Sequence, residues 1–297
     1  MTESGVTFMA EARNYQRITV RPINPVIGAE ITGIDLCQDI DDETTSEIMS
    51  AILDNHVVFF PDQKITPDEH VAFARHFGDV PKVPDSMFQV YSDNPFVSVL
   101  ENDAERPPTV NNWHSDYCFA AKPDFLSILH TQIVPEIGGD TIWVNMYAAY
   151  EAFTDKMKAH LRDLRATHDF MKLYTQPFKA HLWEGERHQY MEAARKEFPP
   201  VLHPVVRTIP ETGRKALFVN ESFTRDIEGL AEAESASLLS FLFDHIRTPE
   251  FQIRYQWRAN TLTVWDNRVT VHYALADYHP RHRRIHRVTV LNHEVPT

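Results

Sequence analysis

The sequence predicts a mainly β protein of the α+β class, with a two-sheet antiparallel roll decorated by helices. Short segments rich in Val, Ile, Thr and aromatic residues recur along the chain and are bounded by Pro, Gly and polar residues. Helical patterns come at irregular intervals and do not alternate one to one with the strands, which argues against a parallel βαβ sheet.

The N-terminal elements follow from local patterns. Residues 18–36 carry β-branched runs broken by Pro and Gly, which predicts two short strands joined by a turn. Residues 41–55 begin with acidic residues and repeat Ile at helical spacing, so we expect a helix, and the apolar run at 56–60 predicts a buried strand. Thr66 and Glu69 form a capping-box pattern that predicts a second helix ending near Gly78.

The middle of the chain predicts strands at 96–100, 125–133 and 141–144, and a helix over 145–165. Residues 170–200 are polar and aromatic without a clear period, which predicts a lid or insertion. A helix is expected at 231–246. The other strands are expected at residues 203–208, 216–220, 251–257, 261–267 and 286–292.

Composition restricts the class of protein. With 297 residues, 43% hydrophobic and 24% charged, the chain is expected to form a single domain over 1–297 with a short flexible N-terminus at 1–16. The formal charge of −13 argues against a nucleic-acid or membrane partner. The chain lacks a membrane-spanning run and a signal-peptide pattern, and it has only two cysteines, so a cytoplasmic location is expected. Cys118 is expected to be a packed hydrophobe and not a nucleophile.

The triplet His114-Ser115-Asp116 is the sharpest local motif. An extended backbone would turn His114 and Asp116 to one face, where an imidazole and a carboxylate could bind one ion. A surface turn or a hydrogen-bonded pair would give the same motif. His272 is a candidate third ligand, and two nitrogens with one oxygen suit iron(II) that also binds an oxo-acid and oxygen, whereas zinc favours a closed tetrahedral set.

A basic cluster at residues 281–287 stands out in this acidic chain. It is either a solvated loop or a strand that turns some guanidinium groups inward toward an anion.

Collinear motifs extend through the chain, among them PVIGAEITGIDL, NNWHSD, GGDTIW, VWDNRVTVHY and HRRIHRVTV. With them the sequence resembles the taurine/2-oxoglutarate dioxygenase family, which includes taurine, alkylsulfate and aryloxyalkanoate dioxygenases. The likeness is strongest to the taurine dioxygenases. The resemblance implies a double-stranded β-helix, the cupin-like jelly roll, and His114, Asp116 and His272 as the metal ligands. It also implies that Thr141 and Arg283 bind the distal carboxylate of 2-oxoglutarate.

The same resemblance implies an oxidoreductase that uses Fe(II), 2-oxoglutarate and O2, releases succinate and CO2, and hydroxylates a small anionic substrate. Family members commonly form homodimers or homotetramers. The residues expected to meet the substrate are Arg287 at its anionic head group, Asn112, Phe170 and Phe223 around it, and Tyr117 through its backbone N–H.

The expected substrate pocket departs from the taurine pattern at three positions. Val83 stands where a histidine is usual, Ser86 where a tyrosine is usual, and Val110 where an asparagine is usual. We therefore expect an organosulfonate, an alkyl sulfate or a carboxylate such as an aryloxyalkanoate, in preference to taurine itself.

Three alternatives remain. A metal-dependent hydrolase could use the same three ligands, but it would need a general base that the neighbouring sequence does not offer. A non-enzymatic binding module would tolerate changes at the ligands. A halogenase would replace the metal carboxylate by a small residue, and Asp116 is present.

Overall fold

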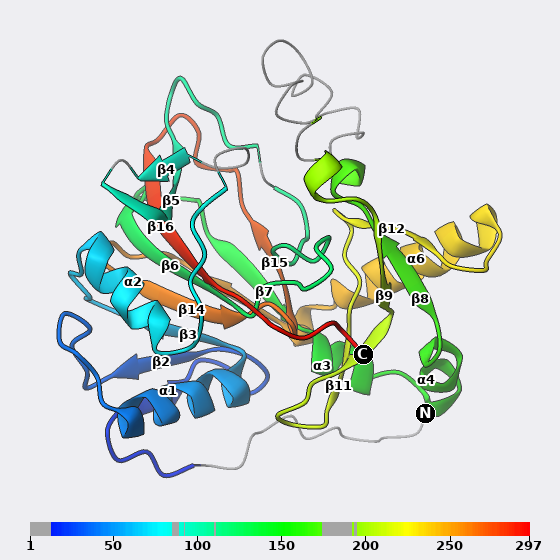
Figure 1. The fold of residues 1–297 in the computed structure, drawn as a ribbon, viewed down its shortest axis with the longest axis horizontal. Helices are drawn as coiled ribbons and strands as arrows, with labels where there is room; N and C mark the ends of the chain where they lie inside the picture. Colours follow the sequence, from blue (N-terminus) through cyan, green and yellow to red (C-terminus); the bar gives the residue numbers. More distant parts are fainter. Residues whose placement is uncertain (1–12, 85–88, 92, 110, 174–191, 193–194) are drawn as a thin grey trace.

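An eight-stranded sheet is the largest sheet among the described residues (Figure 1). The computed structural model describes residues 13–84, 89–91, 93–109, 111–173, 192 and 195–297. The eight strands of the sheet are, in spatial order, β1 Thr19–Pro22, β2 Ala29–Thr32, β3 Val57–Phe60, β14 Leu262–Asp266, β6 Leu126–Ile133, β16 Arg283–Val290, β5 Asn94–Asn102 and β4 Gln89–Tyr91. All neighbours pair antiparallel except β2 and β3, which pair parallel.

A smaller antiparallel sheet packs on one face of the large one. It consists of β13 (Gln252–Tyr255), β7 (Thr141–Asn145) and β15 (Thr270–Ala274). Aromatic side chains fill the space between the two sheets: the Trp143 and Trp265 ring centroids lie 5.7 Å apart, and Phe59 stacks on Tyr255 at 3.7 Å. This two-layer arrangement confirms the predicted jelly roll.

Two helices cover the opposite face of the large sheet. They are α1 (Asp42–Asn55) and α2 (Pro67–Arg75), whose apolar residues form one core cluster with the strands beneath them. The Asp41 side chain accepts from the Thr44 N–H and caps α1, while α2 begins with a complete capping box. Both helices were expected from the sequence.

The remaining elements form a third region beside the small sheet. It contains the three-stranded sheet β12-β8-β9, the pair β10-β11, and helices that pack on them through a shared apolar cluster. The bounds are α3 Met146–Glu151, α4 Asp155–Leu161, β8 Arg165–His168, η1 Phe170–Leu173, β9 Val201–Pro204, β10 Val206–Thr208, β11 Lys215–Leu217, β12 Thr224–Ile227, α6 Glu232–Ile246 and η3 Pro249–Phe251.

One predicted helix was wrong. Residues 145–165 form two helices, α3 and α4, because the chain turns at 152–154 and Thr154 caps the second helix, accepting from the Met157 N–H at 3.3 Å. The segment then ends in β8. Strands β4, β8, β12 and β15 were not predicted.

The two segments expected to be flexible or lid-like are only partly described. Of the expected lid at 170–200, residues 170–173 form the 3-10 helix η1, and most of the rest lies outside the described residues. In the expected flexible N-terminus, the Gln16 N–H donates to Glu47 Oε1 at 2.7 Å, which ties residue 16 to α1.

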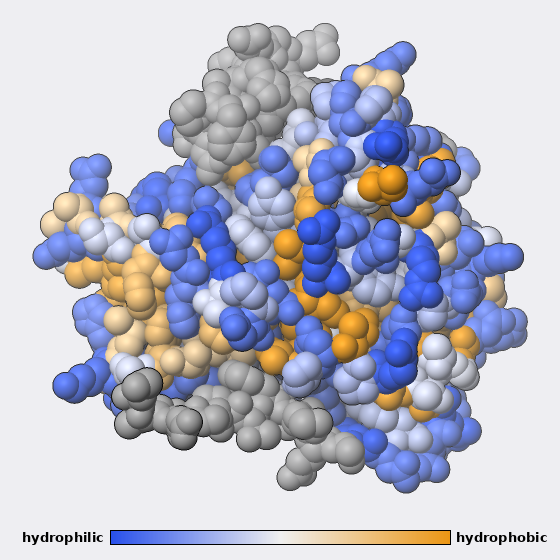
Figure 2. Space-filling view, turned by 180° about the vertical axis from the view of Figure 1, so that it is seen from behind, coloured by the Kyte–Doolittle hydropathy of each residue, from blue (hydrophilic) through white to orange (hydrophobic). Residues whose placement is uncertain are grey.

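No helix among the described residues is long and apolar enough to cross a bilayer. Figure 2 shows hydrophobic residues on the face behind Figure 1, interleaved with hydrophilic ones. The large hydrophobic side chains that are exposed anywhere on the described surface are Ile23, Ile133, Ile137, Phe241 and Val295.

Buried histidines predict how stability depends on pH. Burial lowers the pKa of His56 and of His203 to about 4 each, from an ordinary 6.5. Between pH 6.5 and 4 the unfolded chain therefore binds protons that the folded chain does not. We expect the free energy of unfolding to fall with decreasing pH across this window, by up to about 1.4 kcal/mol per pH unit for each histidine.

His203→Gln tests this expectation by urea unfolding at several pH values in that window. Glutamine can still donate to the Ala120 carbonyl, which His203 Nε2 meets at 2.9 Å, but it cannot titrate. The variant should show a shallower loss of stability on acidification than the wild type. His160→Gln, at an exposed position of α4, should keep the wild-type slope. A wild-type slope in His203→Gln would contradict the assignment.

Candidate metal centre

Two histidines far apart in the chain meet across an isolated antiparallel bridge. The His114 N–H donates to the His272 carbonyl at 3.0 Å, and the His272 N–H donates to the His114 carbonyl at 2.8 Å. Their ring centroids lie 4.1 Å apart. His272 belongs to β15, so the small sheet fixes the position of both rings.

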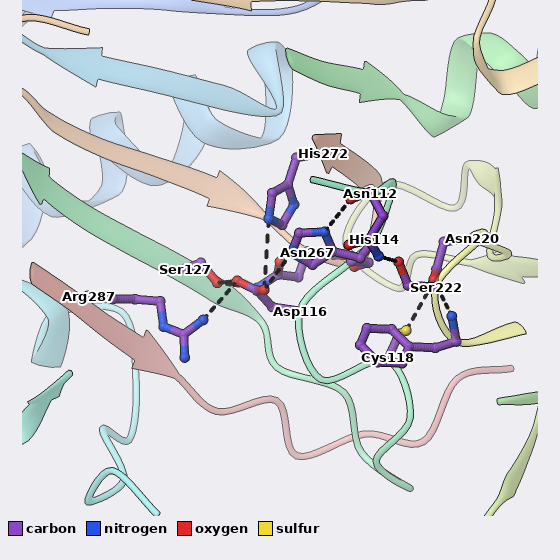
Figure 3. Close-up of polar contacts among 12 residues, drawn as sticks. Asn112, His114, Asp116, Cys118, Ser127, Asn220, Ser222, Asn267, His272 and Arg287 are labelled. Carbon is purple, nitrogen blue, oxygen red and sulfur yellow. Dashed lines mark hydrogen bonds and ion pairs between the residues drawn. The ribbon is translucent and has the colours of Figure 1, made fainter. Parts of the chain in front are cut away.

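Asp116 completes the cluster two residues after His114, at the start of a turn. Its Oδ1 atom lies 3.7 Å from His114 Nε2 and 3.8 Å from His272 Nε2 (Figure 3). These distances are too long for hydrogen bonds, which excludes the hydrogen-bonded His/Asp pair that the triplet alone left open. One donor atom from each of the three residues lies within 4.8 Å of the others.

Hydrogen bonding and burial indicate which nitrogen of each imidazole can bind a metal. His114 Nδ1 lies 2.8 Å from the Asn112 carbonyl, which can only accept, so Nδ1 carries a proton and Nε2 is the nitrogen that faces Asp116. Burial, reinforced by His114, lowers the pKa of His272 to about 3, so this ring is neutral near pH 7. Among the described residues, His272 Nδ1 has no hydrogen-bond partner; the centroid of the Trp265 ring lies 5.0 Å from that of this imidazole.

The carboxylate supplies the negative charge. Burial opposes the ionisation of Asp116, but His272 and Arg287 outweigh it and lower its pKa to about 2. Ser127 Oγ donates to Asp116 Oδ2 at 2.7 Å, and Arg287 Nη1 lies 3.7 Å from the same oxygen. Two imidazole nitrogens and one anionic oxygen that converge at distances too long for hydrogen bonds fit a divalent cation.

Thr141 and Arg283 lie at the start of β7 and of β16, on the two packed sheets. Thr141 Oγ1 accepts from Trp257 Nε1 at 3.0 Å. Arg283 is buried, and burial lowers its pKa; within the described part of the chain its Nε has no hydrogen-bond partner. A Cβ built on Gly139 would lie 3.5 Å from Arg283 Cδ, so the chain just before Thr141 packs on this arginine. A buried guanidinium in this state suits an anionic ligand.

The expected substrate residues come from both sides: Arg287 lies on β16 of the large sheet, whereas Phe170 and Phe223 lie in the third region. The ring centroid of Phe119 lies 4.9 Å from that of Phe170 and 4.8 Å from that of Phe223, and all three belong to one apolar cluster. The Asn112 amide donates to Ser222 Oγ. The Tyr117 backbone has a left-handed φ of 50°, which reverses the chain immediately after Asp116.

Of the three positions that depart from the taurine pattern, the structure describes one. Val83 is described, and its N–H donates to the Pro95 carbonyl at 2.9 Å. Ser86 and Val110 lie outside the described residues. Cys118 is fully buried, and burial raises its pKa to about 12, which agrees with the expected packed hydrophobe.

Sequence reasoning missed the residues that support the cluster. Ser127 and Asn267 are buried beside Asp116, and Asp124 is a further buried carboxyl whose pKa is raised by burial and by Asp116. Ser127 lies inside an apolar strand and carries no motif. Asn267 belongs to the segment WDN, five residues before His272, and this closeness to a candidate ligand was the signal in the sequence that could have pointed to it.

Comparison with known proteins decides the family. The family model described as "Taurine catabolism dioxygenase TauD, TfdA family" matches residues 19–289. The chain belongs to this family. The resemblance drawn from the sequence motifs is thereby confirmed.

Relatives in the TauD/TfdA family match over almost their full length. An alkylsulfatase of Acinetobacter baylyi is 34% identical, over 93% of this chain and 85% of the relative. An alpha-ketoglutarate-dependent sulfate ester dioxygenase of Pseudomonas putida is 32% identical, over 97% and 94%. The crystal structure of a putative alpha-ketoglutarate-dependent taurine dioxygenase of Burkholderia xenovorans superposes with a TM-score of 0.80 at 33% identity, over 94% of each chain.

The donor set predicts that the protein takes up one divalent cation per chain and that Asp116→Ala abolishes this uptake, because the substitution removes the only anionic donor of the cluster. Titration of metal-free protein with Mn(II), followed by electron paramagnetic resonance of the free ion, measures the stoichiometry. Asp244→Ala, at an exposed carboxylate on α6, is the matched control and should bind like wild type. Full Mn(II) uptake by Asp116→Ala would remove Asp116 from the site.

Proposed function

We propose that this protein is an Fe(II)- and 2-oxoglutarate-dependent dioxygenase that hydroxylates a small anionic organic substrate and releases succinate and CO2. The observation that carries the proposal is the converging His114, Asp116 and His272 donor set, within a chain that matches the TauD/TfdA family over residues 19–289. Relatives in this family include proteins named alpha-ketoglutarate-dependent dioxygenases, and the hydrolase alternative is without support.

In this proposal His114, Asp116 and His272 hold Fe(II) through two nitrogens and one oxygen. Such a three-ligand set leaves coordination positions open on one side of the ion. Bound there, iron would supply oxygen activation coupled to oxidative decarboxylation of 2-oxoglutarate. The chain's own part is to hold the ligands, orient both substrates and exclude water.

Thr141 and Arg283 are proposed to bind the distal carboxylate of 2-oxoglutarate. Support comes from the buried Arg283 guanidinium, whose Nε has no hydrogen-bond partner among the residues that the structure describes. Trp257 donates to Thr141 Oγ1, so the hydroxyl proton of Thr141 is left to donate to a carboxylate oxygen. A hydroxyl and a planar charged fork together fix one end of a dicarboxylate.

For the primary substrate, Arg287 is proposed to meet an anionic head group, with Asn112, Tyr117, Phe170 and Phe223 around it. The Phe170 and Phe223 side chains belong to an apolar cluster, which favours an apolar body over a second charged group. We infer an alkyl sulfate, an organosulfonate or an aryloxyalkanoate; the relatives named alkylsulfatase and sulfate ester dioxygenase favour the sulfate ester.

We also propose that residues 1–297 form one domain and that the protein acts in the cytoplasm as a homodimer or homotetramer, as is common for the family. Light scattering coupled to size-exclusion chromatography measures the oligomeric state.

The function is tested with Fe(II)-loaded protein prepared without oxygen, then mixed with 2-oxoglutarate, O2 and one compound from a panel of taurine, longer alkylsulfonates, alkyl sulfates and aryloxyalkanoates. We expect succinate to form fastest with one apolar-bodied member, together with the sulfate, sulfite or phenol that its hydroxylation releases. Equal background succinate with every member would reject the substrate class. No succinate from protein that retains iron would reject the dioxygenase.

Arg283→Lys should raise the KM for 2-oxoglutarate by roughly tenfold or more and leave Mn(II) uptake unchanged, because lysine keeps the charge but loses the two-pronged fork. Arg284→Lys is the matched control: it is the next residue on β16, and strand alternation turns its side chain to the opposite face. The KM is measured from succinate formation. An unchanged KM in Arg283→Lys would show that another residue binds the co-substrate.

A further inference from the structure

A chain of three hydrogen bonds runs through the protein interior to Asp116. Trp265 Nε1 donates to Asn267 Oδ1 at 2.8 Å, Asn267 Nδ2 donates to Ser127 Oγ at 2.8 Å, and Ser127 Oγ donates to Asp116 Oδ2 at 2.7 Å. Figure 3 shows Ser127 and Asn267 beside the carboxylate. The relay residues, Trp265, Asn267 and Ser127, are at most 2% exposed.

The chemistry of the first donor fixes the direction of the whole relay. An indole N–H can only donate, so the Asn267 oxygen must face Trp265 and the Asn267 amide nitrogen must face Ser127. The Ser127 oxygen then accepts, and its single proton is directed to Asp116 Oδ2. Each link therefore has one possible sense, and all three side chains are almost fully shielded from bulk solvent.

The relay divides the two oxygens of the carboxylate between two tasks. Oδ2 accepts from Ser127, whereas Oδ1 is the oxygen that lies 3.7 and 3.8 Å from the two histidine nitrogens. We propose that Trp265, Asn267 and Ser127 are positioning residues that hold Asp116 as a monodentate metal ligand through Oδ1. A carboxylate that turned to bind through both oxygens would occupy a position required by 2-oxoglutarate or O2. This inference rests on the metal role of Asp116 in the proposed function.

Further contacts connect the relay to the other two ligands. The Trp265 ring packs against the His272 ring at 5.0 Å, nearly edge to face, and supports an imidazole whose Nδ1 has no hydrogen-bond partner. Ser115, between His114 and Asp116, donates from its Oγ to the Asn267 carbonyl at 2.7 Å. Trp265 thus contacts His272, and Asn267 is hydrogen-bonded to Ser115, the residue between His114 and Asp116. The pairing of β14 with β6 places Trp265 opposite Ser127 and so holds the two ends of the relay side by side.

The test compares Ser127→Ala, Trp265→Phe and Thr263→Val. Ser127→Ala removes the last donor, whereas Trp265→Phe keeps an aromatic ring against His272 and removes only the first donor. Thr263→Val is the matched control, because Thr263 lies on β14 on the same face as Trp265 and its buried hydroxyl has no hydrogen-bond partner.

Two readouts are used, neither of which is turnover: the dissociation constant for Mn(II), and the absorption band of the anaerobic Fe(II)–2-oxoglutarate complex. We expect Ser127→Ala to weaken Mn(II) binding by roughly 10- to 100-fold and to shift the band, Trp265→Phe to do the same to a smaller extent, and Thr263→Val to match wild type.

Wild-type affinity and band in both Ser127→Ala and Trp265→Phe, with binding lost in Asp116→Ala, would overturn the relay and leave the metal site intact. Wild-type binding in Asp116→Ala would instead overturn the proposed function. If Ser127→Ala does not fold, Trp265→Phe decides: a wild-type band and affinity in that variant reject the relay.

Discussion

The buried negative charge of Asp116 is the constraint on which the site depends. An ionised carboxylate in the protein interior is strongly destabilising unless opposite charges and hydrogen-bond donors surround it. Arg287 lies beside one carboxylate oxygen, the Ser127 hydroxyl donates to that oxygen, and the two histidines flank the other. The environment of this one side chain thus leaves Oδ1 facing both imidazoles, whereas Oδ2 meets the hydroxyl and the guanidinium.

The jelly roll provides the rigidity that this arrangement requires. The histidines come from a backbone bridge at the small sheet, whereas Ser127 and Arg287 come from adjacent strands of the large sheet. The aromatic core between the sheets locks the two layers together, with Trp143 contacting Trp257 and Trp265. The donor cluster therefore lies where the two sheets meet, and helices α1 and α2 pack on the far side of the large sheet.

The basic segment 281–287 shows how strand alternation assigns roles. Both sequence interpretations hold for different residues: residues 281 and 282 are exposed, whereas Arg283 and Arg287 are buried four positions apart on one face of β16. His286 faces the other side and contacts the Tyr91 ring. The charge pattern suggested an inward arginine and the family resemblance pointed to Arg283 and Arg287; the pairing of β16 with β5 and β6 shows that both are buried.

The sequence by itself determined the strand-rich fold, the capped helices α1 and α2, the pairing of His114 with Asp116 in one motif, and the family. These features depend on local periodicity, capping and collinear motifs, which neighbouring residues encode. Tertiary structure decided the bridge from His114 to His272, the break at 152–154 and the relay from Trp265 to Asp116. Those features join strands distant in sequence, and their residues, such as Ser127 in an apolar strand, acquire a role only from the side chains that packing brings beside them.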